Sequence, residues 1–77
     1  MSYDFFLKEF QKCGTFEELE ETLERWRAKV NAEFVDRNHP ELRENLQALE
    51  AAYVEARTLL PRWLAERRGI EDHDRND

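Results

Sequence analysis

The sequence predicts an all-α protein, a small bundle of three to four helices in which two long helices pack antiparallel. Two long segments, beginning near Thr15 and Pro40, repeat apolar residues at alternating spacings of three and four, which places those residues along one side of a helix. Both segments open with helix-start signals. Glycine and proline are scarce, with two of each among 77 residues, so few positions interrupt a helix.

The first predicted helix is short and begins after Ser2, whose hydroxyl suits an N-cap. Its apolar side consists of Tyr3, Phe6, Leu7 and Phe10. Gly14 follows at a position where a left-handed residue commonly ends a helix. We therefore expect this helix to end at Gly14 and the next to start almost immediately.

The second predicted helix is the most strongly specified part of the chain. Thr15 is a suitable N-cap, and the carboxylate of Glu18 is spaced to accept the backbone N–H of Thr15, which would complete a capping box. Its apolar side consists of Phe16, Leu19, Leu23, Trp26 and Val30. The helix is expected to run from Phe16 to about Val35, because the polar residues 36–39 break the pattern.

The third predicted helix begins at Pro40, since proline is favoured at the first helical position, with His39 or Asn38 as its cap. Its apolar side consists of Leu42, Leu46, Leu49, Tyr53, Ala56 and Leu60. Two helices of this length joined by a short connection should pack antiparallel, with the first helix closing one end.

Pro61 should kink this third helix or terminate it, because proline lacks a backbone donor. In the second case residues 62–68 form a separate short helix that carries Trp63 and Leu64 and stops at Gly69. One helical domain is therefore expected over residues 1–69, followed by a mobile acidic tail over residues 70–77.

Composition favours a cytoplasmic protein that does not bind nucleic acid strongly. The formal net charge of −6 opposes attraction to polyphosphate, so any contact with nucleic acid should be indirect or weak. Cys13 is the single cysteine and has no partner for an internal disulfide. The sequence contains neither a secretory signal pattern nor an apolar run of about 18 residues, so no membrane association is expected.

No residue pattern indicates an enzyme, a cofactor or a metal ion. The sequence has no Gly-rich phosphate loop, no Ser-His-Asp set in a recognisable context, and no CxxC or HxxxH spacing. Cys13 is best explained as a packed or merely accessible thiol, and His39 as a loop or capping residue. The expected activity is therefore binding.

Charged and apolar clusters are the candidate binding features. Acidic residues crowd positions 17–24, where a solvated helix face with local Glu21–Arg25 and Glu24–Arg27 pairs is favoured over a cation site. A basic cluster near the end of the folded part is a candidate patch for phosphate or an acidic partner, although cations also gather at helix ends for dipole reasons: Arg57, Arg62, Arg67 and Arg68. Surplus apolar surface for an interface is expected around Phe5, Phe34 or Trp63.

Part of the sequence resembles the Hha/YmoA family of small bacterial gene-expression modulators. The similar residues are the run Asp4-Phe5-Phe6-Leu7 and the run Lys12-Cys13-Gly14-Thr15-Phe16-Glu17-Glu18-Leu19-Glu20. A leucine pair at Leu46 and Leu49 and a tryptophan at Trp63 also match in position. The resemblance covers about 60 residues and is dense over residues 4–23.

This resemblance implies a four-helix all-α fold and a non-enzymatic role: binding the N-terminal dimerisation region of an H-NS-like nucleoid protein. Acidic family residues contact basic residues of that partner, and Glu17 and Glu20 keep the matching sign. Arg43 stands where the family has an aspartate, so Glu44 beside it would supply the negative charge there. The family's basic outer face has only the C-terminal arginines as a counterpart.

We therefore expect a modulator of gene expression that binds a nucleoid-associated or transcriptional regulator through an acidic helix face, with Glu17, Glu20 and Glu44 as contact residues. Two alternatives remain open. One is a helical hairpin that self-associates, for example as a homodimer, through its apolar stripes. The other is an acidic decoy or antitoxin-like inhibitor that covers the nucleic-acid-binding surface of its target.

Overall fold

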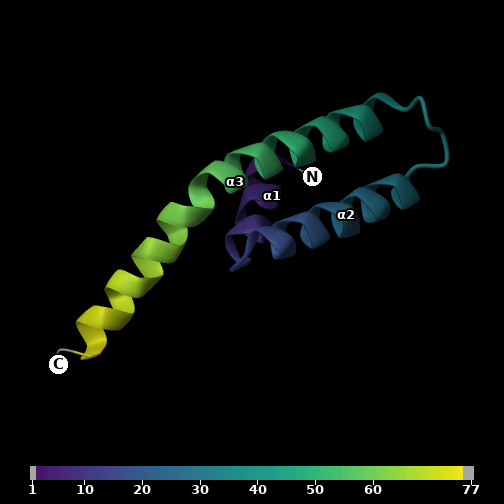
Figure 1. The fold of residues 1–77 in the computed structure, drawn as a ribbon. Coiled ribbons are helices and arrows are strands. Elements are labelled where there is room, and N and C mark those ends of the chain that lie inside the picture. Colours follow the sequence, from purple (N-terminus) through teal and green to yellow (C-terminus); the bar gives the residue numbers. More distant parts are fainter. Residues whose placement is uncertain (1, 76–77) are drawn as a thin grey trace.

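The structure is a computed structural model that describes the backbone of residues 2–75 and the side chains of residues 2–69. Within this range the chain forms three helices and no strand: α1 (Tyr3–Gln11), α2 (Phe16–Glu33) and α3 (Pro40–Arg75) (Figure 1). The all-α prediction is confirmed, and the number of helices falls within the three to four expected.

Side-chain caps set the starts of the first two helices, as predicted. The Ser2 hydroxyl accepts the Phe5 backbone N–H at 3.3 Å, and the Thr15 hydroxyl accepts the Glu18 N–H at 3.0 Å. The Glu18 carboxylate, however, accepts the Gly14 N–H at 3.3 Å and not that of Thr15. The reciprocal half of the expected capping box thus reaches one residue further back along the chain.

Gly14 does not adopt the left-handed conformation expected at the end of α1. No glycine in the described residues has a positive φ, and the C-cap Lys12 is itself in the right-handed helical region. The N–H of Lys12 donates to the Glu9 carbonyl at 3.3 Å, and that of Cys13 donates to the Phe10 carbonyl at 3.0 Å. These tight turns satisfy the last carbonyls of α1, so the left-handed residue is not required.

The connection between α2 and α3 begins slightly before the predicted end of α2 and supplies the cap of α3. Phe34 is the extended C-cap of α2, so the helix stops at Glu33, two residues before the predicted Val35. His39 is the residue that caps α3, because its Nδ1 accepts the Glu41 backbone N–H at 3.1 Å. The predicted start of the third helix at Pro40 is confirmed.

The largest departure from the sequence prediction is that α3 continues through both Pro61 and Gly69 to Arg75. The separate helix over residues 62–68 and the stop at Gly69 were wrong. Leu60 is fully buried and Trp63 and Leu64 pack against the core, and this burial on both sides of Pro61 offsets the roughly 3 kcal/mol that an interior proline costs. Figure 1 shows the axis of α3 changing direction partway along its length, as a proline in a helix commonly causes.

Gly69 does not interrupt α3, because glycine costs an exposed helix only about 1 kcal/mol relative to alanine. The backbone of the segment expected to be a mobile acidic tail is part of α3 as far as Arg75. The side chains of residues 70–75 and all of residues 76–77 lie outside the described part of the structure. The mobility of this segment therefore stays a prediction.

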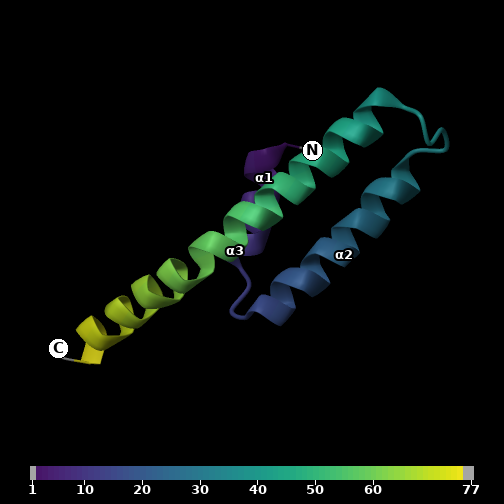
Figure 2. The ribbon, with the colours of Figure 1, turned by 45° about the horizontal axis from the view of Figure 1, so that its top comes forward.

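The two long helices run antiparallel, and α1 crosses them to complete the core (Figures 1 and 2). The helix α1 packs mainly on α3 and touches α2 less extensively. All three helices contribute fully buried side chains, the largest being Phe6, Phe10, Leu19, Val30, Leu49 and Leu60. Each such side chain contributes about 1.5–3 kcal/mol through removal from water, so this seam holds the fold together.

The molecule is elongated, with extents of 56 × 18 × 17 Å. Its radius of gyration is 15.4 Å, whereas a compact chain of this length would have about 11.5 Å. The cause is visible in Figure 1, where the C-terminal part of α3 extends beyond α1 and α2. The core therefore sits at one end of the long helix.

Replacing Thr15 by alanine should destabilise the fold by about 1 kcal/mol, because the N-cap acceptor for the Glu18 N–H is lost. Urea unfolding followed by circular dichroism would measure the change. A matched control is Thr58→Ala, since the hydroxyl of this exposed residue within α3 donates only to the Val54 carbonyl one turn earlier. Equal effects of the two changes would contradict the capping role.

Candidate protein-binding surface

The first half of α2 carries a continuous row of carboxylates, here named the acidic strip: Glu17, Glu20, Glu21 and Glu24. All four side chains are exposed. At 3.6 residues per turn they fall within roughly 100° around the helix axis, on the side away from the buried Leu19 and Leu23. The structure thus places two of the predicted contact residues, Glu17 and Glu20, on one surface.

Little positive charge compensates this strip. Glu24 pairs with Arg27 at 2.6 Å, as predicted, and Arg27 also reaches Glu50 of α3 at 3.5 Å. No salt bridge among the described residues involves the other three carboxylates of the strip. Like charges one turn apart repel by a few tenths of a kcal/mol per pair. Because the chain's own cations leave most of this repulsion uncompensated, binding of a cationic partner would reduce it.

The predicted pairing of Glu21 with Arg25 is wrong. The Arg25 guanidinium instead donates from Nη2 to the hydroxyl of Thr22 at 3.2 Å. Thr22 is buried next to α1, so its hydroxyl draws the guanidinium towards that flank of α2 and away from the acidic strip. This contact leaves Glu21 exposed without a local cation.

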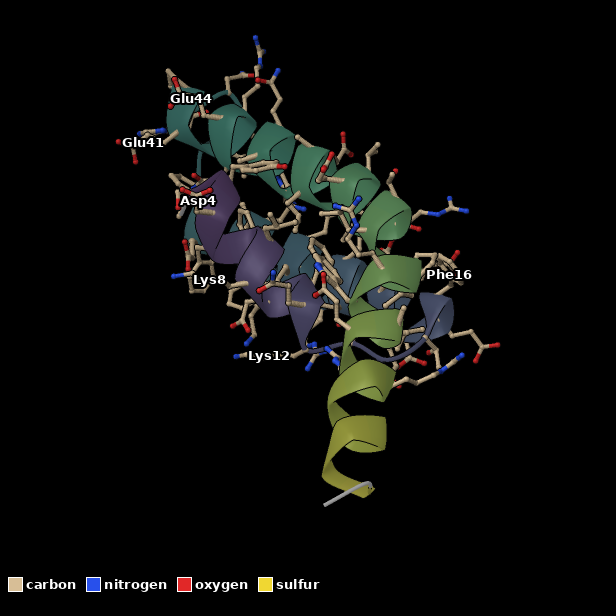
Figure 3. The ribbon with its side chains drawn as sticks, turned by 90° about the vertical axis from the view of Figure 1, so that its left-hand side faces the viewer. Asp4, Lys8, Lys12, Phe16, Glu41 and Glu44 are labelled. Atoms are coloured by element: carbon tan, nitrogen blue, oxygen red, sulfur yellow. The ribbon has the colours of Figure 1, made fainter. Side chains whose placement is uncertain are left out.

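Glu44 is exposed but does not lie with the acidic strip. The Arg27–Glu50 contact sets α2 and α3 in register. Glu44 lies about one and two-thirds turns before Glu50, near the level of the end of α2. At 1.5 Å rise per residue this is roughly 20 Å along the axis from Glu20. Figure 3 agrees, since Glu44 appears on the same side as Asp4 and Glu41 while Phe16 lies on the opposite side.

Phe16 is an exposed aromatic residue that the sequence pattern assigned to the buried stripe. Its side chain is 48% exposed, directly before the acidic strip. Periodicity identifies the side of the helix on which a residue lies, but not whether another helix covers that side at the very first turn. Phe5 remains 39% exposed, as expected of surplus apolar surface, whereas Phe34 and Trp63 pack against the core.

The four C-terminal arginines do not form one patch. Because α3 is continuous, each step of five residues from Arg57 to Arg62 to Arg67 turns by about 140° around the axis. Arg57 lies over the Tyr53 ring at 5.9 Å. Arg67 donates to the carbonyls of Gln11 and Cys13, at 3.3 Å for Cys13, and thereby joins α3 to the end of α1.

The other residues considered for chemistry are Cys13 and possible metal ligands. Cys13 is 5% exposed, and its Sγ lies 3.3 Å from the Thr22 hydroxyl, which agrees with a packed thiol. The part of the chain that the structure describes contains no group of three or more His, Cys, Asp or Glu residues placed to hold a metal ion. None of its helices combines the length and apolar character needed to cross a membrane.

Comparison with protein-family models, with curated proteins and with solved structures finds no match for this chain. The resemblance to the Hha/YmoA family therefore rests on the residues quoted above and is neither supported nor contradicted by these comparisons. Function must be argued from the surface itself.

Arg67→Ala should loosen α1 from α3, because the side chain bridges them through two backbone carbonyls. The exposed position limits the loss to about 0.5–1 kcal/mol, and amide hydrogen exchange in α1 should become several-fold faster. Arg68→Ala removes a neighbouring arginine that is also exposed and that, unlike Arg67, donates no hydrogen bond to the carbonyls of Gln11 or Cys13, and it serves as the control. Unchanged exchange in the Arg67 variant would rule out the bridging role.

Proposed function

We propose that this chain is a non-enzymatic protein-binding module that modulates gene expression by docking on a basic surface of a nucleoid-associated or transcriptional regulator. The observation that carries the proposal is the acidic strip, in which Glu17, Glu20 and Glu21 are exposed and have no salt bridge within the described residues. Opposite charge on a partner would speed association and fix its orientation, and salt would weaken the complex.

Phe16 supplies the apolar contact that the row of carboxylates lacks. Exposed ion pairs alone contribute little to affinity, whereas a buried aromatic residue near the centre of an interface contributes strongly. Phe16 directly precedes the strip in the first turn of α2 and is half-exposed, so a partner that pairs with Glu17 and Glu20 can also cover this ring. The proposed interface is therefore an aromatic anchor beside an acidic rim.

The resemblance to the Hha/YmoA family suggests an H-NS-like protein as the specific partner and the cytoplasm as the location. The family's acidic contacts correspond to Glu17 and Glu20, which lie on the exposed side of α2 as such contacts require. Glu44 would belong to the same interface only if the partner extends roughly 20 Å along the helix pair. A partner of smaller footprint would contact the acidic strip alone.

Charge reversal by Glu17→Lys with Glu20→Lys should weaken binding to the N-terminal dimerisation region of an H-NS-type protein by about tenfold or more. Both side chains are exposed, so the fold should remain intact by circular dichroism. Calorimetric titration at low and at physiological salt would measure the effect.

A matched control is Glu33→Lys with Glu55→Lys, which changes the net charge equally at exposed positions outside the strip. If both double variants weaken binding to the same degree, the effect is one of net charge and not of the strip. If binding of the first variant is unchanged at physiological salt, the acidic strip is not the interface.

Self-association is the second candidate function. It is favoured by exposed apolar side chains on both long helices, since Phe16 of α2 is 48% and Val54 of α3 is 64% exposed. Sedimentation equilibrium distinguishes it from the first proposal, because a homodimer held by apolar contacts would persist in high salt. The decoy alternative is separated by adding DNA: a modulator leaves DNA bound to the regulator, whereas a decoy displaces it.

A further inference from the structure

The side of α2 that faces the end of α1 borders a pocket of about 370 Å³. Its lining includes three cationic side chains, Lys12, Arg25 and Lys29, although the chain as a whole has a net charge of −6. Thr22 and Trp26 contribute a hydroxyl and an indole to the same lining. The size falls within the range of pockets that hold small groups or side chains of a ligand.

Each of the three cations makes a contact within the protein. Lys12 pairs with Glu9 at 2.7 Å, and Arg25 donates to the buried Thr22 hydroxyl at 3.2 Å. Lys29 Nζ lies 4.8 Å from the centre of the Trp26 ring. Arg25 and Lys29 form no salt bridge with any described carboxylate, so their charge is available to an anion.

Aromatic side chains lie next to the cations of the pocket. The Trp26 ring packs edge-on against Phe5 at 5.2 Å and against Phe6 at 5.8 Å, measured between ring centres. Phe6 is buried, but Phe5 is 39% exposed and Trp26 is partly exposed. A ligand that reaches Arg25 and Lys29 therefore meets aromatic surface next to the charge.

We infer that this pocket binds an acidic, apolar peptide segment of a partner protein. A carboxylate of the segment lies between Arg25 and Lys29, and a neighbouring apolar side chain packs on Trp26 and Phe5. Glu9 and Glu18 also line the pocket, and together with the net charge of −6 they disfavour a polyphosphate chain more than a segment with one or two carboxylates. These charges therefore favour a peptide over nucleic acid as the ligand.

This site goes beyond the proposed function and does not depend on it. The acidic strip and the pocket lie on adjoining sides of α2, with Arg25 about 40° around the helix axis from Glu21, and they have opposite charge preference. The two sites fail or succeed separately in experiments, since they share no residue.

The test uses the emission of Trp26 as the signal. In a Trp63→Phe background Trp26 is the only tryptophan. The probe is the capped peptide acetyl-Asp-Leu-Phe-Asp-amide, compared with acetyl-Asn-Leu-Phe-Asn-amide of the same shape without charge. The acidic peptide should change the emission saturably with a Kd below about 1 mM, and the uncharged peptide should bind at least about tenfold more weakly. The Trp26 indole N–H resonance in the unmodified chain provides a second readout if Trp63→Phe perturbs the fold.

Arg25→Gln with Lys29→Gln should reduce affinity for the acidic peptide about tenfold or more. The control is Arg43→Gln with Arg68→Gln, which removes the same charge at exposed positions outside the pocket and should leave the affinity unchanged. Three results would each overturn the inference: no saturable change up to about 1 mM peptide, equal binding of the uncharged peptide, or tighter binding of a single-stranded oligonucleotide that displaces the peptide.

Discussion

The fold depends on the burial of α1 against the two long helices. A pair of antiparallel helices leaves one side of its apolar seam exposed, and Phe6 and Phe10 of α1 fill that side. Phe10 packs edge-on against Tyr53 of α3 with ring centres 5.9 Å apart, and Phe6 packs similarly against Trp26 of α2 at 5.8 Å. Without these two aromatic side chains a chain of this size would have too little buried apolar surface to offset its conformational entropy.

The position of α1 also determines which surfaces of α2 remain available. One flank of α2 faces α1 and gains the pocket with Arg25 and Lys29. The outer side has no helix over it, so the acidic strip and the ring of Phe16 stay exposed. A single amphipathic helix thus presents two surfaces of opposite charge because its neighbours cover only part of its circumference. The acidic strip and the pocket near Arg25 both follow from that division.

Local signals in the sequence predicted most of the fold. The caps at Ser2 and Thr15 and the start at Pro40 follow from interactions within a few residues, and these were confirmed. The apolar stripes were confirmed except at their first residues in α1 and α2, since Tyr3 and Phe16 are exposed. The departures at Gly14, Pro61 and Gly69 have separate causes. Tight turns satisfy the last carbonyls of α1 without a left-handed residue at Gly14, and burial of Leu60 and Trp63 offsets the cost of Pro61 inside α3. Gly69 does not end α3 because glycine costs an exposed helix only about 1 kcal/mol relative to alanine. Of the candidate site, the exposure of Glu17 and Glu20 was predictable, whereas the exposure of Phe16 and the distance of Glu44 were not.

The helical class, the helix starts and the row of carboxylates could all be read from the sequence, because helix periodicity and capping act over one or two turns. Three features could be seen only in the folded chain: α3 is continuous, Arg57, Arg62 and Arg67 lie on different sides of it, and Arg67 bridges to α1. The pocket near Arg25 also exists only because α1 folds back beside α2. These features join residues distant along the chain, and their geometry depends on the sum of burial energies over the whole core, which no local pattern contains.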